Sequence, residues 1–207
     1  TAHLRTVSVP TGRAFINVDS HGENAIVVVA GANAQVGVED NFFIPHSRVV
    51  LAQLEVPLET IEMAFTQARN NGAVTVLNPA PARDIPQTLL ALANIVVPNE
   101  TESAAIGGTK NLLNLGVATV VTTLGADGAS IDTASSTTHI APHKVTPIDT
   151  VGAGDAFIGA TCAELSRGAS IEDAARMGAI AGALATTVKG AVPSLPTRQA
   201  VLAAQKS

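Results

Sequence analysis

The sequence predicts an α/β protein, a doubly wound and mainly parallel sheet with helices on both faces and a small β-lid hairpin. Short apolar runs alternate with longer helical patterns, as they do in βαβ units. Each strand-like run is apolar at nearly every position, which is typical of strands buried on both faces. Hydrophobic residues make up 46% of the chain and aromatic residues only 2%, so closely packed Ala, Val, Leu and Ile must fill the core.

The first element is a predicted hairpin over 13–29, in which turn residues at 19–22 separate two β-rich runs. Residues 1–30 therefore form part of the lid and the entry to the core, and 31–207 form the α/β core. Further strands are predicted at 49–54, 74–77, 95–97 and 119–124, and on the two sides of a turn at 126–128. Helices are predicted at 58–71, 101–115, 154–166, 171–188 and 197–205.

Composition excludes several classes of function. The net charge is −5 and no run of Lys or Arg occurs, so the basic surface of a nucleic-acid-binding protein is missing. The most apolar stretches are shorter than the roughly 20 residues that cross a bilayer, and residues 1–10 lack the apolar part of a signal sequence. The single cysteine, Cys162, lies in an apolar helical pattern and is expected to be a buried structural thiol. These features favour a cytoplasmic protein.

The residues that point most clearly to chemistry lie at 149–157, where Asp149-Thr-Val-Gly-Ala-Gly-Asp155-Ala-Phe runs from a glycine turn into an apolar helix. Small residues let backbone N–H groups approach an anion, and a helix N-terminus adds about half a positive charge. Asp155 would then lie beside a bound phosphate, where a carboxylate can accept the proton of an attacking hydroxyl. The alternative is that Asp155 only caps the helix and the glycines only turn the chain.

The complete nine-residue string resembles the C-terminal signature of the ribokinase, or phosphofructokinase-B, family of sugar kinases. The resemblance extends over about 11–196. It implies phosphoryl transfer from MgATP to the primary hydroxyl of D-ribose, with Asp155 as the general base and an anion hole made by Gly152, Ala153 and Gly154. A kinase for another sugar or a nucleoside, and a non-catalytic fragment that binds nucleotide, are the alternatives.

Two further segments carry nucleotide-site residues of the family. Asn99 and Glu102 have the spacing of a helix capping box, and in the family the same pair lies beside the triphosphate and the water shell of Mg²⁺. The glycine turn after the strand at 119–124 is an ordinary β-turn by composition. By resemblance it faces the ATP. The resemblance assigns nucleotide contacts in and beyond these segments to Thr123, Gly125, Gly128, Gly154 and Ala179.

The resemblance also implies an activating monovalent cation, K⁺, next to the anion hole. Its ligands would be backbone carbonyls and one carboxylate, which suit a hard cation. The matching positions are Asp149, Val151, Ala185, Val188, Gly190 and Ser194. A homodimer formed through the β-lid is expected as well.

Evidence for the sugar comes from the segments at 22–24, 31–34, 53–55 and 77–82, which resemble the ribose-specific branch of the family. Glu55 ends a run predicted to be a buried strand, where a carboxylate needs a polar partner. By resemblance it lines the sugar pocket; otherwise it is a surface residue at a strand end. The family's N-terminal Asn-x-Asp and Gly-Gly-x-x-x-Asn motifs are not found, so we expect the functional polypeptide to be longer.

The stretch from Ile106 to Lys110 is shorter than its counterpart in the family. It contains Gly107 and Gly108, and each glycine inside a helix costs about 1 kcal/mol relative to Ala. A continuous helix is therefore not expected, and a tight turn between two helices is one alternative. We expect instead a break, with one Cα–Cα separation between Glu102 and Lys110 much longer than the distance of about 3.8 Å across a trans peptide.

Overall fold

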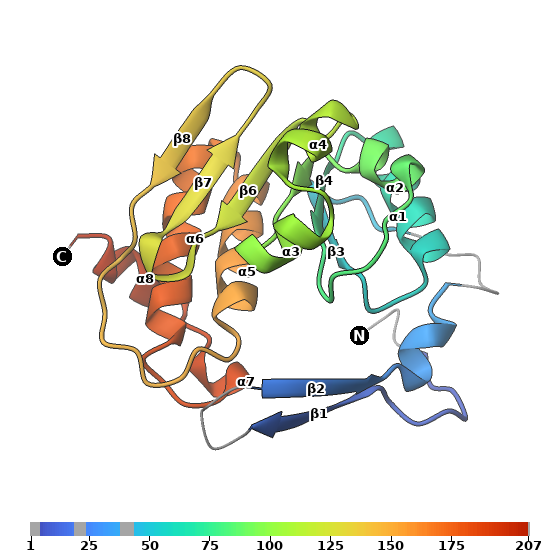
Figure 1. Cartoon of the computed structure of the whole chain (residues 1–207), viewed down its shortest axis with the longest axis horizontal. Coiled ribbons are helices and arrows are strands. Elements are labelled where there is room, and N and C mark those ends of the chain that lie inside the picture. The colour runs from blue at the N-terminus through green and yellow to red at the C-terminus, as the bar shows by residue number, and fades with distance from the viewer. Residues whose placement is uncertain (1–4, 19–23, 38–43, 207) are drawn as a thin grey trace.

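The computed structural model describes residues 5–18, 24–37 and 44–206. Its main sheet has six strands in the order β3-β4-β5-β6-β7-β8 (Figure 1). The pairs from β3 to β6 are parallel, whereas β7 and β8 add to the edge beyond β6 in antiparallel fashion. The strands are β3 (Val49–Gln53), β4 (Val74–Asn78), β5 (Ile95–Val96), β6 (Thr119–Thr123), β7 (Ala129–Asp132) and β8 (Thr137–Ile140). The predicted α/β sheet is confirmed.

Helices cover both faces of this sheet. The chain alternates between strand and helix along β3 to β6, which places the parallel strands side by side. The helices are α1 (Leu58–Asn70), α2 (Gln87–Leu92), α3 (Glu100–Ala105), α4 (Thr109–Asn114), α5 (Ala153–Ser166), α6 (Ile171–Ala185), α7 (Ala191–Ser194) and α8 (Arg198–Ala204). The short helices α2 and α7 are not among the elements that the sequence predicted.

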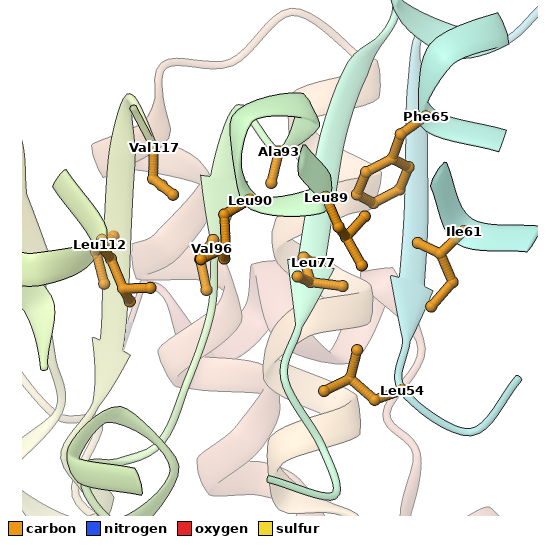
Figure 2. Close-up of a cluster of buried hydrophobic side chains, with 11 residues drawn as sticks. Leu54, Ile61, Phe65, Leu77, Leu89, Leu90, Ala93, Val96, Leu112 and Val117 are labelled. Carbon is orange, nitrogen blue, oxygen red and sulfur yellow. The ribbon is translucent and has the colours of Figure 1, made fainter. Parts of the chain in front are cut away.

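Two clusters of buried side chains fill the space between the helices and the sheet. Successive residues of a strand point to opposite faces, so Leu77 belongs to one cluster and Val76 to the other. The cluster in Figure 2 joins Leu77, Val96 and Val120 to Ile61 and Phe65 of α1 and to residues of α2 and α4. The second cluster packs β-strand residues against α5 and α6. This arrangement is that of a doubly wound domain.

Strand β3 forms an edge of the sheet, because it pairs only with β4 among the described strands. Its residues are only partly buried, and Leu51 is 41% exposed. The prediction that every strand of the core is buried on both faces is therefore wrong for β3. An apolar run identifies a strand, but its burial depends on which strands lie next to it.

A separate two-stranded antiparallel sheet, β1 (Arg13–Val18) and β2 (Asn24–Val29), confirms the strands of the predicted hairpin. It lies across the bottom of the view in Figure 1, apart from the six-stranded sheet. The predicted turn at 19–22 lies outside the described residues. Phe15 pairs with Val27 across this sheet, and their side chains are 54% and 56% exposed.

The predicted helix over 101–115 is two helices, α3 and α4. The chain passes from α3 to α4 through a tight turn, in which the N–H of Gly108 donates to the carbonyl of Ser103 at 2.7 Å. Gly107 and Gly108 have φ of 92° and 82°, a left-handed backbone that glycine adopts without a steric penalty. The expected break between Glu102 and Lys110 is therefore wrong, since the glycine pair makes a turn that joins the helices directly.

Candidate active site

A left-handed glycine starts the helix that carries Asp155. Gly152 has φ 82° and ψ 0° and is the N-cap residue of the 14-residue helix α5. A β-carbon at Gly152 would lie 3.2 Å from the Cα of Ala191, so the chain at 190–191 passes close to this turn. Both the backbone angle and the close approach require glycine at this position.

The N-terminus of α5 presents free donors. Among the described residues, the N–H groups of Gly154 and Asp155 have no backbone acceptor, whereas the N–H of Ala156 donates to the carbonyl of Gly152 at 2.9 Å. Gly154 is exposed, and a β-carbon placed there would meet no atom within 4 Å. Unpaired N–H groups at a helix N-terminus can bind an anion. The predicted anion-hole residues Gly152, Ala153 and Gly154 thus lie together around exposed donors.

Asp155 lies in the first turn of α5 and its carboxylate is exposed to solvent. Its Oδ1 lies 3.3 Å from the side-chain nitrogen of Gln53, at the end of β3. The same nitrogen donates to Oδ1 of Asn78, at the end of β4, at 2.8 Å. Sequence reasoning missed the contact of Gln53 with Asp155 and the bond of Asn78 to Gln53. The available signal was that both polar side chains end parallel strands, where ligands of open α/β sheets bind.

Close packing of α5 on α6 fixes the position of the anion hole relative to the rest of the domain. A β-carbon at Gly182 of α6 would lie 3.1 Å from the carbonyl oxygen of Ala153. One at Gly178 would lie 2.2 Å from Oγ1 of Thr161 and 2.8 Å from the carbonyl oxygen of Phe157. These two glycines let the helix backbones approach each other more closely than any larger residue would allow.

Asn99 and Glu102 form the capping box that their spacing predicts. The N–H of Glu102 donates to Oδ1 of Asn99 at 2.7 Å, and the N–H of Asn99 donates to Oε2 of Glu102 at 2.9 Å. Burial raises the pKa of Glu102, and the hydrogen bond from Asn99 opposes that effect. The cap uses the amide oxygen of Asn99 and one carboxylate oxygen of Glu102. Asn99 is exposed.

The two predicted nucleotide segments lie side by side. Asn99 and Thr123 form a parallel bridge, and the N–H of Thr123 donates to the carbonyl of Pro98 at 2.9 Å. Gly125, with φ 55°, is exposed and would meet no atom within 4 Å if it carried a β-carbon. The structure therefore brings Asn99, Thr123 and Gly125 together at the ends of β5 and β6.

Gly128 and Ala179 are placed differently. Gly128 is buried with φ 90°, and a β-carbon there would lie 2.1 Å from the carbonyl oxygen of Ile140. Packing against β8 thus explains this glycine without any ligand. Ala179 of α6 is partly buried against the cluster that contains Ile131 of β7 and Ile140 of β8.

Asp149 ties together the two loops expected to hold a cation. Its Oδ1 accepts from the N–H of Val151 at 3.0 Å, and its Oδ2 accepts from the N–H of Gly190 at 2.8 Å. These hydrogen bonds, with a smaller contribution from Lys189, lower the pKa of Asp149. Its carboxylate is consequently ionised at neutral pH, as a ligand of a cation must be.

The remaining members of the predicted cation set lie on the same two loops or at the end of α6. The N–H of Val188 donates to the carbonyl of Ala185 at 3.3 Å, which turns the chain at the end of that helix. Ser194 is buried, and its hydroxyl donates to the carbonyl of Ala191 at 2.7 Å. No group of three or more His, Cys, Asp or Glu side chains that could hold a metal occurs in the described residues.

Glu55 lies in a turn just after β3 and is exposed. The sequence placed it at the end of a buried strand, which is wrong because β3 is an edge strand among the described residues and is only partly buried. An exposed carboxylate needs no partner, so burial gives no argument for a role in binding. Glu55 is related to Asp155 only through its place in the chain, because its turn directly follows Gln53, which contacts Asp155.

Two expectations from composition can be compared with the structure. Cys162 is partly buried rather than fully buried as predicted. The burial that it has raises the pKa of its thiol to about 11, so the thiol stays protonated at neutral pH. In the part of the chain that the structure describes, no helix is both long enough and apolar enough to span a bilayer.

The chain is similar to known proteins along nearly its whole length. The family model for pfkB family carbohydrate kinases matches residues 1–198. Ribokinase of Staphylococcus aureus is 39% identical over 215 residues, covering 96% of this chain and 71% of that protein. The solved ribokinase of Thermotoga maritima is similar with a TM-score of 0.84 at 34% identity, covering 97% of this chain and 71% of that one. Arabidopsis thaliana ribokinase, solved with ribose and ATP, has a TM-score of 0.82 at 29% identity, covering 97% and 70%.

Proposed function

The chain belongs to the pfkB family of carbohydrate kinases, and from this premise we propose that it phosphorylates the primary hydroxyl of D-ribose. The phosphoryl donor is ATP. One observation carries the proposal: Asp155 lies in the first turn of α5, where Gly154 and Asp155 are exposed and their N–H groups have no backbone acceptor among the described residues. The same turn therefore offers donors for the transferred phosphoryl group and a carboxylate for the acceptor hydroxyl.

The chemistry follows from these two features. The hydroxyl oxygen of the sugar attacks the γ-phosphorus, a new O–P bond forms, and the bond to the leaving ADP oxygen breaks. The carboxylate of Asp155 accepts the hydroxyl proton. The N–H groups at the start of α5, in the turn of Gly152, Ala153 and Gly154, stabilise the negative charge on the phosphoryl oxygens.

Residues at the ends of β5 and β6 bind the nucleotide in this proposal. Asn99 and Thr123 adjoin each other, and Gly125 leaves open space above the backbone. Glu102 acts with Asn99 near the triphosphate, where Mg²⁺ would neutralise phosphate charge. Gly128 shapes the loop, and Ala179 contributes from α6.

A monovalent cation, K⁺, would be held by Asp149 together with backbone oxygens of the neighbouring loops. The ionised carboxylate of Asp149 and its bond to Gly190 support this placement, because they join the two loops beside the anion hole. Such a cation would add positive charge near the phosphoryl-binding N–H groups. The proposed ligands are Asp149, Val151, Ala185, Val188, Gly190 and Ser194.

The β1–β2 sheet is proposed as a lid over the sugar and as the contact surface of a homodimer, with Glu55 in the sugar pocket. Residues 1–30 would form this lid and the entry to the nucleotide-binding and catalytic core at 31–207. The exposed apolar pair Phe15 and Val27 supports a partner on this sheet. The single cysteine, Cys162, is partly buried and is consistent with a reducing, cytoplasmic location.

The experiment that tests this proposal replaces Asp155 by Asn in the intact protein. We expect kcat with D-ribose and ATP to fall about 10²–10⁴-fold, because the general base is lost, with little change in the KM for ATP. Asn caps helices about as well as Asp, so the thermal midpoint should stay close to that of the wild type.

Asp173→Asn is the matched control, because Asp173 is also an exposed aspartate in the first turn of a helix, α6. It should leave kcat unchanged. An Asp155→Asn protein that keeps most of its kcat would show that Asp155 is not the base. If kcat/KM is higher with another sugar or a nucleoside than with D-ribose, that compound is the substrate and the assignment of D-ribose is wrong.

A further inference from the structure

An amide side chain links the candidate base to the sheet. Gln53 and Asn78 are register partners at the ends of β3 and β4, and Nε2 of Gln53 lies 2.8 Å from Oδ1 of Asn78. The same Nε2 lies 3.3 Å from Oδ1 of Asp155, which is 102 residues away in sequence. Helix α5 and the sheet are thus connected at the reacting group itself.

The hydrogen-bond network determines which way both amides face. Asn78 is 5% exposed, and its Nδ2 donates to the carbonyl of Val97 at 2.9 Å. A carbonyl can only accept, so the amide nitrogen of Asn78 must face Val97 and its oxygen must face Gln53. Gln53 must therefore present its nitrogen, which has a second hydrogen to donate to Asp155.

The position of Gln53 is held from its backbone as well. Its strand pairs with β4, and the N–H of the following residue, Leu54, donates to the carbonyl of Ala80 at 2.9 Å. Gln53 and Asp155 line the same hollow, of about 290 Å³, together with Leu51 and Ile158. In the described part of the chain, Oδ2 of Asp155 has no hydrogen-bond partner, so it is the oxygen that is open to a substrate.

We propose that Gln53 is a positioning residue for the phosphoryl transfer: it holds Oδ1 of Asp155 so that Oδ2 faces the acceptor hydroxyl. Asn78 sets the orientation of Gln53 from behind. The inference rests on the proposed role of Asp155 as general base. It adds a specific cause for the carboxylate's orientation, which an exposed side chain in a helix first turn would otherwise lack.

The test combines Gln53 and Asp155 variants in one double-mutant cycle with D-ribose and ATP. Gln53→Met keeps the length of the side chain and removes the donor. We expect kcat to fall about tenfold or more, as for loss of a hydrogen bond to a charged group, with the KM for ATP unchanged. In the Asp155→Asn background the same change should produce no further fall, because Gln53 acts through Asp155.

Gln53→Glu provides a second variant of the same size without the donor, and it should lower kcat at least as much. Gln87→Met is the matched control, since Gln87 is an exposed glutamine at the start of α2. Wild-type kcat in both Gln53 variants, or an equal loss on top of Asp155→Asn, would overturn the positioning role while leaving Asp155 as the base. Full activity of Asp155→Asn alone would overturn both proposals.

Discussion

Replacing Gly178 by Ala should destabilise the domain, although the same change inside most helices is stabilising. Gly178 lies in α6 where this helix crosses α5. A β-carbon there would lie 2.2 Å from Oγ1 of Thr161 and 2.8 Å from the carbonyl oxygen of Phe157. Neither distance is compatible with van der Waals contact, so the neighbouring helix must give way.

The cost has two parts and one compensation. Thr161 is 1% exposed and its hydroxyl donates to the carbonyl of Phe157 at 2.8 Å. Turning the hydroxyl away loses this bond, which contributes about 0.5–1.5 kcal/mol. Separating the backbones costs a further 1–3 kcal/mol or so, as in overpacked cores. Alanine regains about 1 kcal/mol of helix propensity, which leaves a net loss of about 2 kcal/mol.

Thermal unfolding followed by circular dichroism measures this loss. For a chain of this size, about 2 kcal/mol corresponds to a fall of about 4–8 °C in Tm. Gly159→Ala is the matched control: Gly159 is also inside a helix, α5, but a β-carbon there would meet no atom within 4 Å. That variant should gain about 1 kcal/mol. A Gly178→Ala protein that melts at or above the wild-type temperature would refute the reasoning.

Two further predictions concern charge. Burial raises the pKa of Glu102, so its contribution to stability is fully present below its unfolded pKa and is lost as pH rises through its folded pKa. Glu102→Gln keeps the capping box with Asn99, and in urea unfolding between about pH 4 and 7 its stability should fall less, or rise more, with increasing pH than that of the wild type; an identical pH dependence would contradict this. Replacing Na⁺ by K⁺ at constant ionic strength should raise kcat, and Asp149→Asn should reduce the difference between the salts, whereas equal wild-type rates would argue against the cation site.

Local patterns determined much of the fold. The run at 74–77 predicts a buried strand, and β4 (Val74–Asn78) is indeed buried beyond its first residue. The capping box of Asn99 and Glu102 follows from residue types three positions apart. The glycine turn before α5 was recognisable from the contiguous residues at 152–154, and the structure shows that Gly152 has a left-handed backbone.

Other elements were beyond the reach of local patterns. Helices α2 (Gln87–Leu92) and α7 (Ala191–Ser194) are too short for a hydrophobic period to emerge. The exposed state of β3 and of Glu55 after it depends on strand order, which no single run of residues encodes. Gly107 and Gly108 signalled an interruption, but only the backbone angles revealed a tight turn in place of a break.

The sequence by itself determined which residues could do chemistry, since Asp155 and the glycine turn before it are contiguous. Only the tertiary structure decided what surrounds them. Gln53 contacts Asp155 across 102 positions of sequence, and Asn99 adjoins Thr123 through strand pairing. The physical reason is that helix and turn signals depend on neighbours a few residues apart, whereas the contacts of a site are set by how strands order and helices pack.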